Sequence, residues 1–244
     1  MGKSTNRKMV FKQFTVRDDR CAMKIGTDAV ALGALASHSS PNNILDIGTG
    51  SGIVALMLAQ RYPDAKVTAI ELEPQAYSQS QENFSDSPFS SRITAVNERF
   101  QSWVDLTAEQ FDLIVTNPPF FNSQSRSPIE ARNMARHDDY LKVEEIFNGV
   151  NKVLGDGGRL AVVWPMERTE DLLQSATANN FSLLEKIDIL PTKDHSAVRF
   201  VATFVKCEVE SSVLRKLTLE EGVGDDRRFT PVYLDLVREF FLKA

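Results

Sequence analysis

The chain has few of the features that mark secreted, membrane-embedded or metal-binding proteins. Its 244 residues include only two cysteines, Cys21 and Cys207, which lie far apart and do not have the spacing of metal ligands. Residues 1–20 are polar and basic and lack the apolar core of a signal peptide. No apolar run approaches the roughly 18 residues that a membrane span needs. These absences predict a cytoplasmic protein without disulfides, without a metal site and without a membrane anchor.

A net charge of −5 excludes a polycation that is attracted to any nucleic acid. The basic residues are nevertheless unevenly distributed. One cluster lies in the N-terminal segment and consists of Lys3, Arg7, Lys8, Lys12, Arg17, Arg20 and Lys24. A second cluster consists of Arg126, Arg132, Arg136 and His137. Basic segments on an acidic body suit a local contact with phosphates, although a solvated tail and a solvated loop explain the same pattern.

The order of apolar runs predicts one α/β domain, because strand-like segments alternate with helical ones. Strands are expected at 44–47, 66–70, 92–96, 112–116 and 159–164, and helices at 28–36, 53–61, 73–84, 140–154 and 166–179. Two more strands, 183–190 and 198–207, share a short polar link that predicts an antiparallel hairpin. We expect a mostly parallel seven-stranded sheet with helices on both faces. A basic tail and cap segment (1–40) precedes this main domain (41–244), which ends in a strand and a helix at 229–242.

A glycine-rich loop, Gly48-Thr-Gly-Ser-Gly52, follows the first strand, and Glu71 ends the second strand about twenty residues further on. Glycines let a backbone approach a ligand closely, and a carboxylate at a strand tip can accept both hydroxyls of a ribose. The loop lacks the glycine spacing of the dinucleotide fingerprint and the Gly-Lys-Ser/Thr of a phosphate loop. With Asp46 just before it, the loop predicts a site for a small nucleoside or amino acid; a plain tight turn is the alternative.

Gly26-Thr27-Asp28 predicts the start of the first helix, with Thr27 or Asp28 as the capping residue. A helix N-terminus attracts anions, including a carboxylate. His38 and His195 fall in expected loops, where we expect them to be solvated.

The fourth strand stops at Asn117-Pro-Pro-Phe-Phe121. Two consecutive prolines have no N–H and a fixed φ, so strand pairing cannot continue through them. A carboxamide, a rigid carbonyl and an aromatic face therefore meet at the carboxyl end of a strand, where ligands bind in open α/β sheets. The loop 121–139 carries the second basic cluster and is long enough to be a lid. A strand that ends at a plain Pro-Pro turn is the alternative.

Together the two motifs resemble those of a known superfamily. Asp46-x-Gly-x-Gly-x-Gly52 resembles motif I of the class I methyltransferases that use S-adenosylmethionine. Asn117-Pro-Pro-Phe120 resembles their motif IV, as found in enzymes that methylate exocyclic or amide nitrogens. The resemblance implies a Rossmann-like fold, S-adenosylmethionine as the methyl donor and S-adenosylhomocysteine as the product. In such a site the side-chain oxygen of Asn117 and the carbonyl of Pro118 can hold the two hydrogens of an amino group. A base that stacks on Phe120 would gain about 1–3 kcal/mol.

The target nitrogen is not determined by this motif, which DNA and RNA adenine-N6 methyltransferases share with enzymes that methylate a glutamine amide of release factors. Glutamine enzymes of this kind carry a helical substrate domain before motif I, and only a short segment precedes it here. DNA enzymes usually carry a target-recognition insertion, for which this chain has no room. A ribosomal-RNA adenine-N6 or protein-glutamine methyltransferase remains the alternative, and a non-catalytic donor-binding or RNA-binding module is a third hypothesis.

A closer resemblance extends from about residue 10 to the C-terminus. It is carried by Phe11-Lys-Gln-Phe14, Cys21-Ala-Met-Lys-Ile-Gly-Thr-Asp28, Leu45-Asp-Ile-Gly-Thr-Gly-Ser-Gly52, Ala55-Leu-Met-Leu-Ala-Gln-Arg61, Asn117-Pro-Pro-Phe-Phe121 and Ala135-Arg-His137. In this order the motifs are similar to those of the bacterial tRNA1(Val) adenine-N6 methyltransferases. The resemblance implies a flipped-out adenosine, number 37 beside the anticodon, with the anticodon arm of tRNA as the partner. We expect a monomer, although no sequence pattern determines the oligomeric state.

The resemblance also assigns residues by position. Donor binding falls to Thr27, Asp46, Gly48, Gly50, Glu71 and Asn117, and catalysis to Asn117, Pro118 and Phe120. Pro119 and Phe121 border the corner that would hold the adenine, and the second basic cluster, Arg126, Arg132, Arg136 and His137, is expected from its charge to contact the RNA. Many relatives place an acid directly after the third strand to meet the adenine of the donor. Here the strand ends in Asn97 with Glu98 next, and either residue can take that part.

Overall fold

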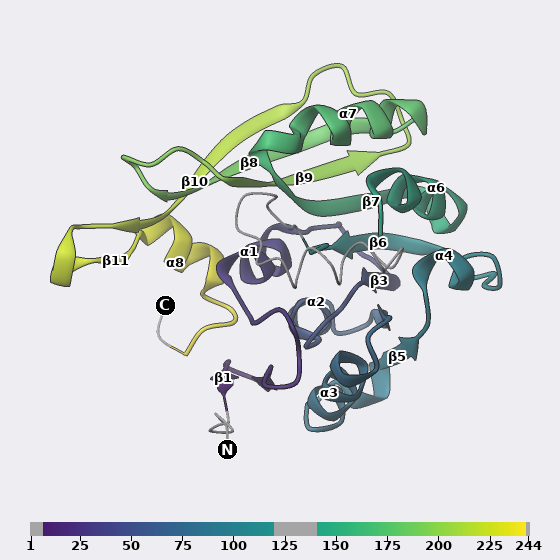
Figure 1. Cartoon of the computed structure of the whole chain (residues 1–244), viewed down its shortest axis with the longest axis horizontal. Helices are drawn as coiled ribbons and strands as arrows, with labels where there is room; N and C mark the ends of the chain where they lie inside the picture. The colour runs from purple at the N-terminus through teal and green to yellow at the C-terminus, as the bar shows by residue number, and fades with distance from the viewer. Residues whose placement is uncertain (1–6, 120–140, 243–244) are drawn as a thin grey trace, which may run out of the picture.

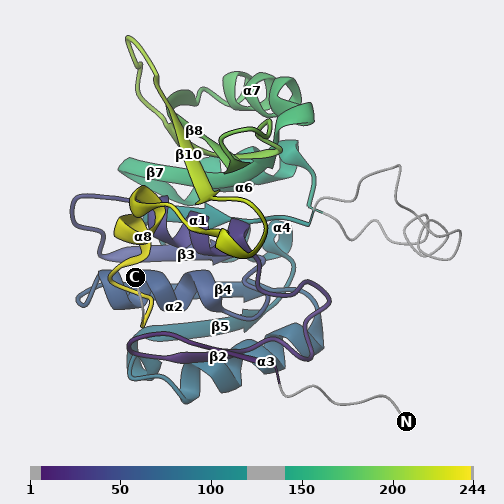
Figure 2. The same ribbon diagram turned by 90° about the vertical axis from the view of Figure 1, so that its left-hand side faces the viewer.

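The computed structural model describes residues 7–119 and 141–242. Within them, the main element is a nine-stranded sheet with the order β5-β4-β3-β6-β7-β9-β8-β10-β11 (Figures 1 and 2). The strands are β5 (Ile93–Asn97), β4 (Lys66–Glu71), β3 (Asn43–Ile47), β6 (Phe111–Thr116), β7 (Leu154–Pro165), β9 (Arg199–Val205), β8 (Ser182–Thr192), β10 (Val213–Glu221) and β11 (Arg228–Phe229). Figure 2 shows them stacked from β5 at the bottom to β8 and β10 at the top.

The strand directions confirm the predicted fold class. From β5 to β7 all neighbours are parallel, and β9 runs antiparallel between β7 and β8, as the predicted hairpin requires. The sheet has two more strands than the seven expected, because β10 pairs with β8 and β11 pairs with the end of β10. The first four residues of β10, Val213-Leu-Arg-Lys216, do not alternate between apolar and polar side chains, and only Leu217-Thr-Leu219 does, which is too short to predict this strand.

Helices cover both faces of the sheet. On one face lie α1 (Thr27–Leu35), α2 (Ile53–Arg61) and α8 (Pro231–Val237), and on the other lie α4 (Phe100–Trp103), α6 (Val143–Val153) and α7 (Thr169–Ala178). Alternate residues of β6 show the division, since Leu113 and Val115 pack with α1 and α2 while Ile114 packs with α6 and α7. The central strands are therefore buried on both sides, which fixes the loops at their ends.

The remaining elements lie at the borders of this core. The helix α3 (Pro74–Ser85) packs against β4 and β5, and α8 follows β11 as the predicted strand and helix of the tail. Single helical turns occur at Ser90–Arg92, Met166–Arg168 and Gly224–Asp226. The segment 155–158, between the expected helix 140–154 and the expected strand 159–164, belongs to β7.

The N-terminal part forms a separate hairpin of β1 (Lys8–Val10) and β2 (Thr15–Arg17) that contacts the C-terminal part of the chain. The backbone N–H of Lys12 donates to the carbonyl of Phe240 at 2.8 Å. The rings of Phe11 and Phe241 lie edge to face, with 5.7 Å between their centroids. This hairpin is thus anchored to residues far away in the sequence.

Candidate active site

The glycine loop leads from β3 into α2 and is tight on one side only. Gly48, Gly50 and Gly52 have φ values of 70°, 55° and 83°, in the left-handed region that favours glycine. A Cβ added at Gly52 would lie 2.3 Å from the ring atom Cε1 of Phe84, whereas at Gly48 and Gly50 it would meet nothing within 4 Å. The loop therefore packs on α3 below and leaves open space beside Gly48 and Gly50.

Asp46 is buried under this loop and holds it in place. Its Oδ2 accepts hydrogen bonds from the hydroxyl of Thr49 at 2.6 Å and from the backbone N–H of Ala55 at 3.2 Å. Burial raises the pKa of Asp46 to about 7; these two hydrogen bonds oppose the rise, and the charge of Glu71 adds to it. The carboxylate thus ties the loop to the first turn of α2.

Glu71 ends β4 beside the glycine loop. Its Oε2 accepts from the N–H of Gly50 at 2.8 Å, and its Oε1 accepts from the N–H of Glu73 at 2.9 Å. Burial raises the pKa of this carboxyl, which the backbone hydrogen bonds partly offset. The glycine loop and Glu71, which lie about twenty residues apart in the sequence, are therefore in direct contact.

Asn97 and Glu98 follow the neighbouring strand, β5. The side chain of Asn97 donates to the carbonyls of Glu71 at 2.8 Å and Leu72 at 3.0 Å. Both Asn97 and Glu98 are exposed. Asn97 thus braces the tip of β4, and the exposed Glu98 follows it in the chain.

The Asn-Pro-Pro corner begins beside the glycine loop. Ile47 and Thr116 are paired as the last residues of β3 and β6, and the hydroxyl of Thr116 donates to the carbonyl of Ile47 at 2.9 Å. Gly48 and Asn117 are the next residue on each strand, so the two motifs start side by side. Asn117 is half-buried and Pro118 is buried, whereas Pro119 is exposed. We call this border of the sheet, where β3, β4, β6 and β7 end, the carboxyl edge.

Six predicted site residues lie outside the described residues: Phe120, Phe121, Arg126, Arg132, Arg136 and His137. The other two histidines have partners outside both motifs. His38 is half-buried and shares hydrogen bonds with Tyr62, and exposed His195 contacts Thr192 within the β8–β9 turn.

Thr27 is exposed and is the first residue of α1, which starts at this residue rather than at Asp28. The expected cap was wrong, because the capping residue is Gly26 and neither Thr27 nor Asp28 closes the first turn with its side chain. Asp28 instead approaches Arg199, with 3.8 Å between carboxylate oxygen and Nε. Since Arg199 pairs with Pro165 at the end of β7, the start of α1 lies at the carboxyl edge.

The segment from Arg17 to Gly26, here called the strap, joins β2 to α1. Its basic residues are bound to the chain itself. Arg17 pairs with Asp86 and Arg20 with Glu82, both on or next to α3. Lys24 donates to three backbone carbonyls within the strap. Much of the N-terminal basic cluster therefore stabilises the fold, a role that the distribution of charges in the sequence did not indicate.

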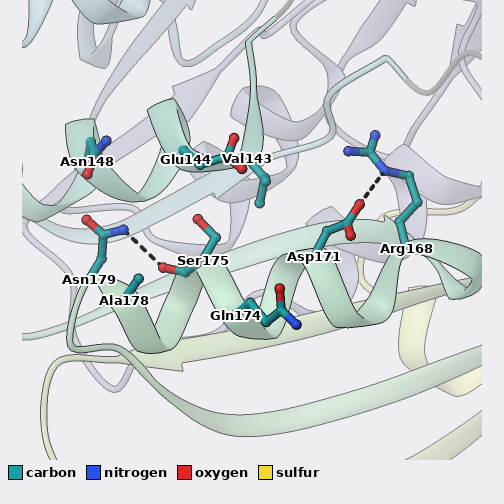
Figure 3. A pocket seen from close by; sticks show the side chains of 9 residues that line it. All are labelled: Val143, Glu144, Asn148, Arg168, Asp171, Gln174, Ser175, Ala178 and Asn179. Atoms are coloured by element: carbon teal, nitrogen blue, oxygen red, sulfur yellow. Dashed lines mark hydrogen bonds and ion pairs between the residues drawn. The ribbon is translucent and has the colours of Figure 1, made fainter.

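A hollow of about 530 Å³ lies between α6 and α7, apart from these motifs (Figure 3). Its lining is mostly polar, with an ion pair of Arg168 and Asp171 at 3.2 Å. Among the described residues, none of the predicted site residues lines it. No group of three or more His, Cys, Asp or Glu in the described parts could hold a metal ion. A bilayer-spanning helix is also absent there, since no described helix combines the necessary length and apolarity.

The sheet order and the two motifs at its carboxyl edge define a class I methyltransferase. Residues 23–186 match the family model of the methyltransferase small domain. The chain is 38% identical to a tRNA1(Val) (adenine(37)-N6)-methyltransferase of Trichodesmium erythraeum, over 96% of this chain and 97% of the relative. The chain therefore belongs to the family of tRNA1(Val) (adenine(37)-N6)-methyltransferases.

Solved structures agree on the fold. A predicted O-methyltransferase from Agrobacterium tumefaciens matches with a TM-score of 0.69 and 20% identity, covering 87% of this chain and 96% of that one. A glycopeptide N-methyltransferase, MtfA, in complex with S-adenosylmethionine matches with a TM-score of 0.54 and 11% identity, covering 75% and 87%. The fold is thus that of methyltransferases that use S-adenosylmethionine.

Proposed function

We propose that this protein transfers a methyl group from S-adenosylmethionine to the exocyclic N6 of adenosine 37 in tRNA1(Val). The observation that carries the proposal is the adjacency of the glycine loop and the Asn-Pro-Pro corner. Gly48 and Asn117 each follow a residue of the pair Ile47–Thr116, so a donor beside one motif meets a target beside the other. The near full-length similarity to curated enzymes of this activity supports the choice of substrate.

The residues at the carboxyl edge fit the donor. Space is open where a side chain would stand at Gly48 and Gly50, so a ligand can lie against the backbone there. Oε2 of Glu71 accepts from Gly50 and Oε1 from Glu73, and a carboxylate has about four acceptor positions, so it keeps capacity to accept ribose hydroxyls. Glu98 is exposed next to this position and can accept from an adenine amino group. S-adenosylmethionine supplies an activated methyl group on its sulfonium.

The Asn-Pro-Pro corner suits the acceptor amino group. The nitrogen of an adenine amino group donates its lone pair into the ring and is a poor nucleophile. The side-chain oxygen of Asn117 and the carbonyl of Pro118 can accept its two hydrogens and so expose the lone pair. Phe120 would stack on the base, and Pro119 and Phe121 would border it. Correct placement for in-line attack then provides much of the acceleration.

For the RNA we propose contacts with Arg126, Arg132, Arg136 and His137, which follow the Asn-Pro-Pro corner in the sequence. The N-terminal basic cluster contributes less to RNA binding in this proposal, because the side chains of Arg17, Arg20 and Lys24 already bond to other groups of the protein. A loop adenosine suits such a site, since unstacked bases of RNA loops can be flipped out at low cost. We further propose a monomer that acts on the anticodon arm in the cytoplasm, without a metal ion.

The test is Asn117→Ala. We expect kcat to fall at least about a hundredfold, as for the loss of a positioned polar group in other active sites, while donor Kd stays within about threefold. Asn148→Ala is the matched control, since it removes the same amide from the exposed surface of α6 and should leave both values unchanged. Loss of donor affinity without loss of kcat would contradict the assigned role of Asn117.

A genetic test addresses the substrate. Mass spectrometry of tRNA nucleosides should show loss of N6-methyladenosine from tRNA1(Val) in cells that lack the gene, and its return with the wild-type gene. Unaltered N6-methyladenosine in every tRNA would refute the proposed substrate.

A further inference from the structure

One face of α3 carries polar side chains that are as buried as the core. Gln79 and Asn83 are each 1% exposed, and Ser80 is fully buried. A buried amide costs free energy unless its donors and acceptor are satisfied, so these side chains need fixed partners. Gln79 and Asn83 find theirs in the strap and in the glycine loop.

Asn83 bonds to both. Its Oδ1 accepts from the N–H of Arg17 at 3.0 Å, and its Nδ2 donates to the carbonyl of Arg17 at 2.8 Å. The same Nδ2 donates to the carbonyl of Ser51 at 2.8 Å. Asn83 thus uses its acceptor and both its donor hydrogens, and it joins the strap to the centre of the glycine loop.

The Ser51 carbonyl belongs to the peptide that leads into Gly52. The N–H of this peptide donates to Thr49 at 2.8 Å, and the ring of Phe84, next to Asn83 on α3, fills the space beside Gly52. The carbonyl and the N–H of this peptide are both hydrogen-bonded and the Phe84 ring packs beside it, so contacts with α3 fix its orientation. The same contacts fix the orientation of the glycine loop and therefore the open side of Gly48 and Gly50.

The strap reaches the donor side of the site. Arg17 of the strap and Ser51 of the glycine loop bond to the same side chain, Asn83, so the strap begins within one side chain of that loop. Burial, together with the charge of Glu71, raises the pKa of the Cys21 thiol in this strap to about 12. Lys24 holds the turn around Cys21 by donating to the carbonyls of Asp18 and Cys21 at 2.7 and 2.8 Å. Gln79 fastens the same turn by accepting from the N–H of Arg20 at 3.1 Å.

We propose that Asn83 is a positioning residue for the methyl donor, because it locks the strap and the glycine loop into one rigid wall of the donor site. The inference rests on the proposed use of S-adenosylmethionine and adds to it a residue that touches neither donor nor RNA. It assigns the strap to the donor side rather than to the RNA.

The experiment compares Asn83→Ala with Thr230→Val by calorimetric titration of S-adenosylmethionine and by steady-state kinetics. Thr230 is a matched control, since it is also buried and its hydroxyl bonds two backbone groups, at Thr218 of β10 and Tyr233 of α8, at the other end of the strand order from β4 and β5. We expect Asn83→Ala to raise donor Kd and donor KM about tenfold, with kcat at saturating donor reduced less than about threefold. Thr230→Val should change only thermal stability.

A folded Asn83→Ala protein with donor Kd within about twofold of the wild type would overturn the inference. Hydrogen exchange of the wild-type protein gives a second test that needs no variant. Saturating donor should slow exchange in the strap together with residues 48–52, and an unchanged strap beside a protected glycine loop would also overturn it. Wild-type protein that binds no donor would instead refute the proposed function.

Discussion

A methyl group placed at Gly48 is the sharpest test of where the donor lies. At the φ of +70° found at Gly48, an alanine lowers the free energy of unfolding by about 1–2 kcal/mol because of the left-handed conformation, but its Cβ meets no atom within 4 Å. Gly48→Ala should therefore fold with only this loss of stability. A donor against this backbone would clash with the methyl group, and overpacking of about 1–3 kcal/mol corresponds to a donor Kd about 5 to 150 times higher.

Gly157→Ala supplies the control for this test. Gly157 has φ +72° and the same open surroundings, but it lies near the start of β7, at the border opposite the carboxyl edge. Both variants should lose similar unfolding free energy in urea, and only Gly48→Ala should lose affinity in calorimetric titration. Equal donor affinity of Gly48→Ala and wild type would refute the placement of the donor, as would a comparable loss in Gly157→Ala.

Two further predictions concern pH and salt. The pKa of Asp46 is about 7 in the folded protein and 3.8 for an ordinary aspartate. As pH rises between these two values, the carboxyl of Asp46 loses its proton in the unfolded chain before it does so in the folded protein, so the stability of the folded protein falls. In urea titrations, the unfolding free energy of the wild type should fall relative to that of Asp46→Asn by up to about 1.4 kcal/mol per pH unit in this window. If the difference between the two unfolding free energies stays constant with pH, Asp46 is not the source of the pH dependence. Replacement of Arg126, Arg132 and Arg136 by Ala should weaken tRNA binding and reduce the salt slope of log K by about 2 to 3. Unchanged tRNA affinity would remove this loop from the RNA site.

The central strands of the sheet and the proximity of the glycine loop to the Asn-Pro-Pro corner could be predicted from the sequence. Strands 44–47 and 112–116 are short apolar runs closed by glycine or proline, and parallel strands bring such ends to one edge. The contact of Glu71 with Gly50 follows from the same geometry. Roles at these positions were assigned by resemblance, and their tests are the variants above.

The parts that sequence reasoning missed depend on contacts over long distances in the chain. Arg17, Arg20 and Lys24 were counted as a basic cluster, but their partners on α3 and in the strap are not visible as a local pattern. In the sequence, Asn83 is an ordinary polar residue near the end of the expected helix 73–84. The one available signal was that Gln79 and Asn83 stand four residues apart and so share a helix face.

The contact between the Phe11–Lys12 turn and residues 240–241 bears on the order in which the protein is made and folded. Domains emerge from the ribosome N-terminal end first, yet this hairpin cannot complete its contacts until Phe240 and Phe241 have emerged. The strap begins at the end of the same hairpin, with β2 as its first anchor. A nascent chain therefore anchors this hairpin, and the strap that follows it, only after residues 240–241 have emerged, and a chain terminated before them lacks the partner of its own N-terminal hairpin.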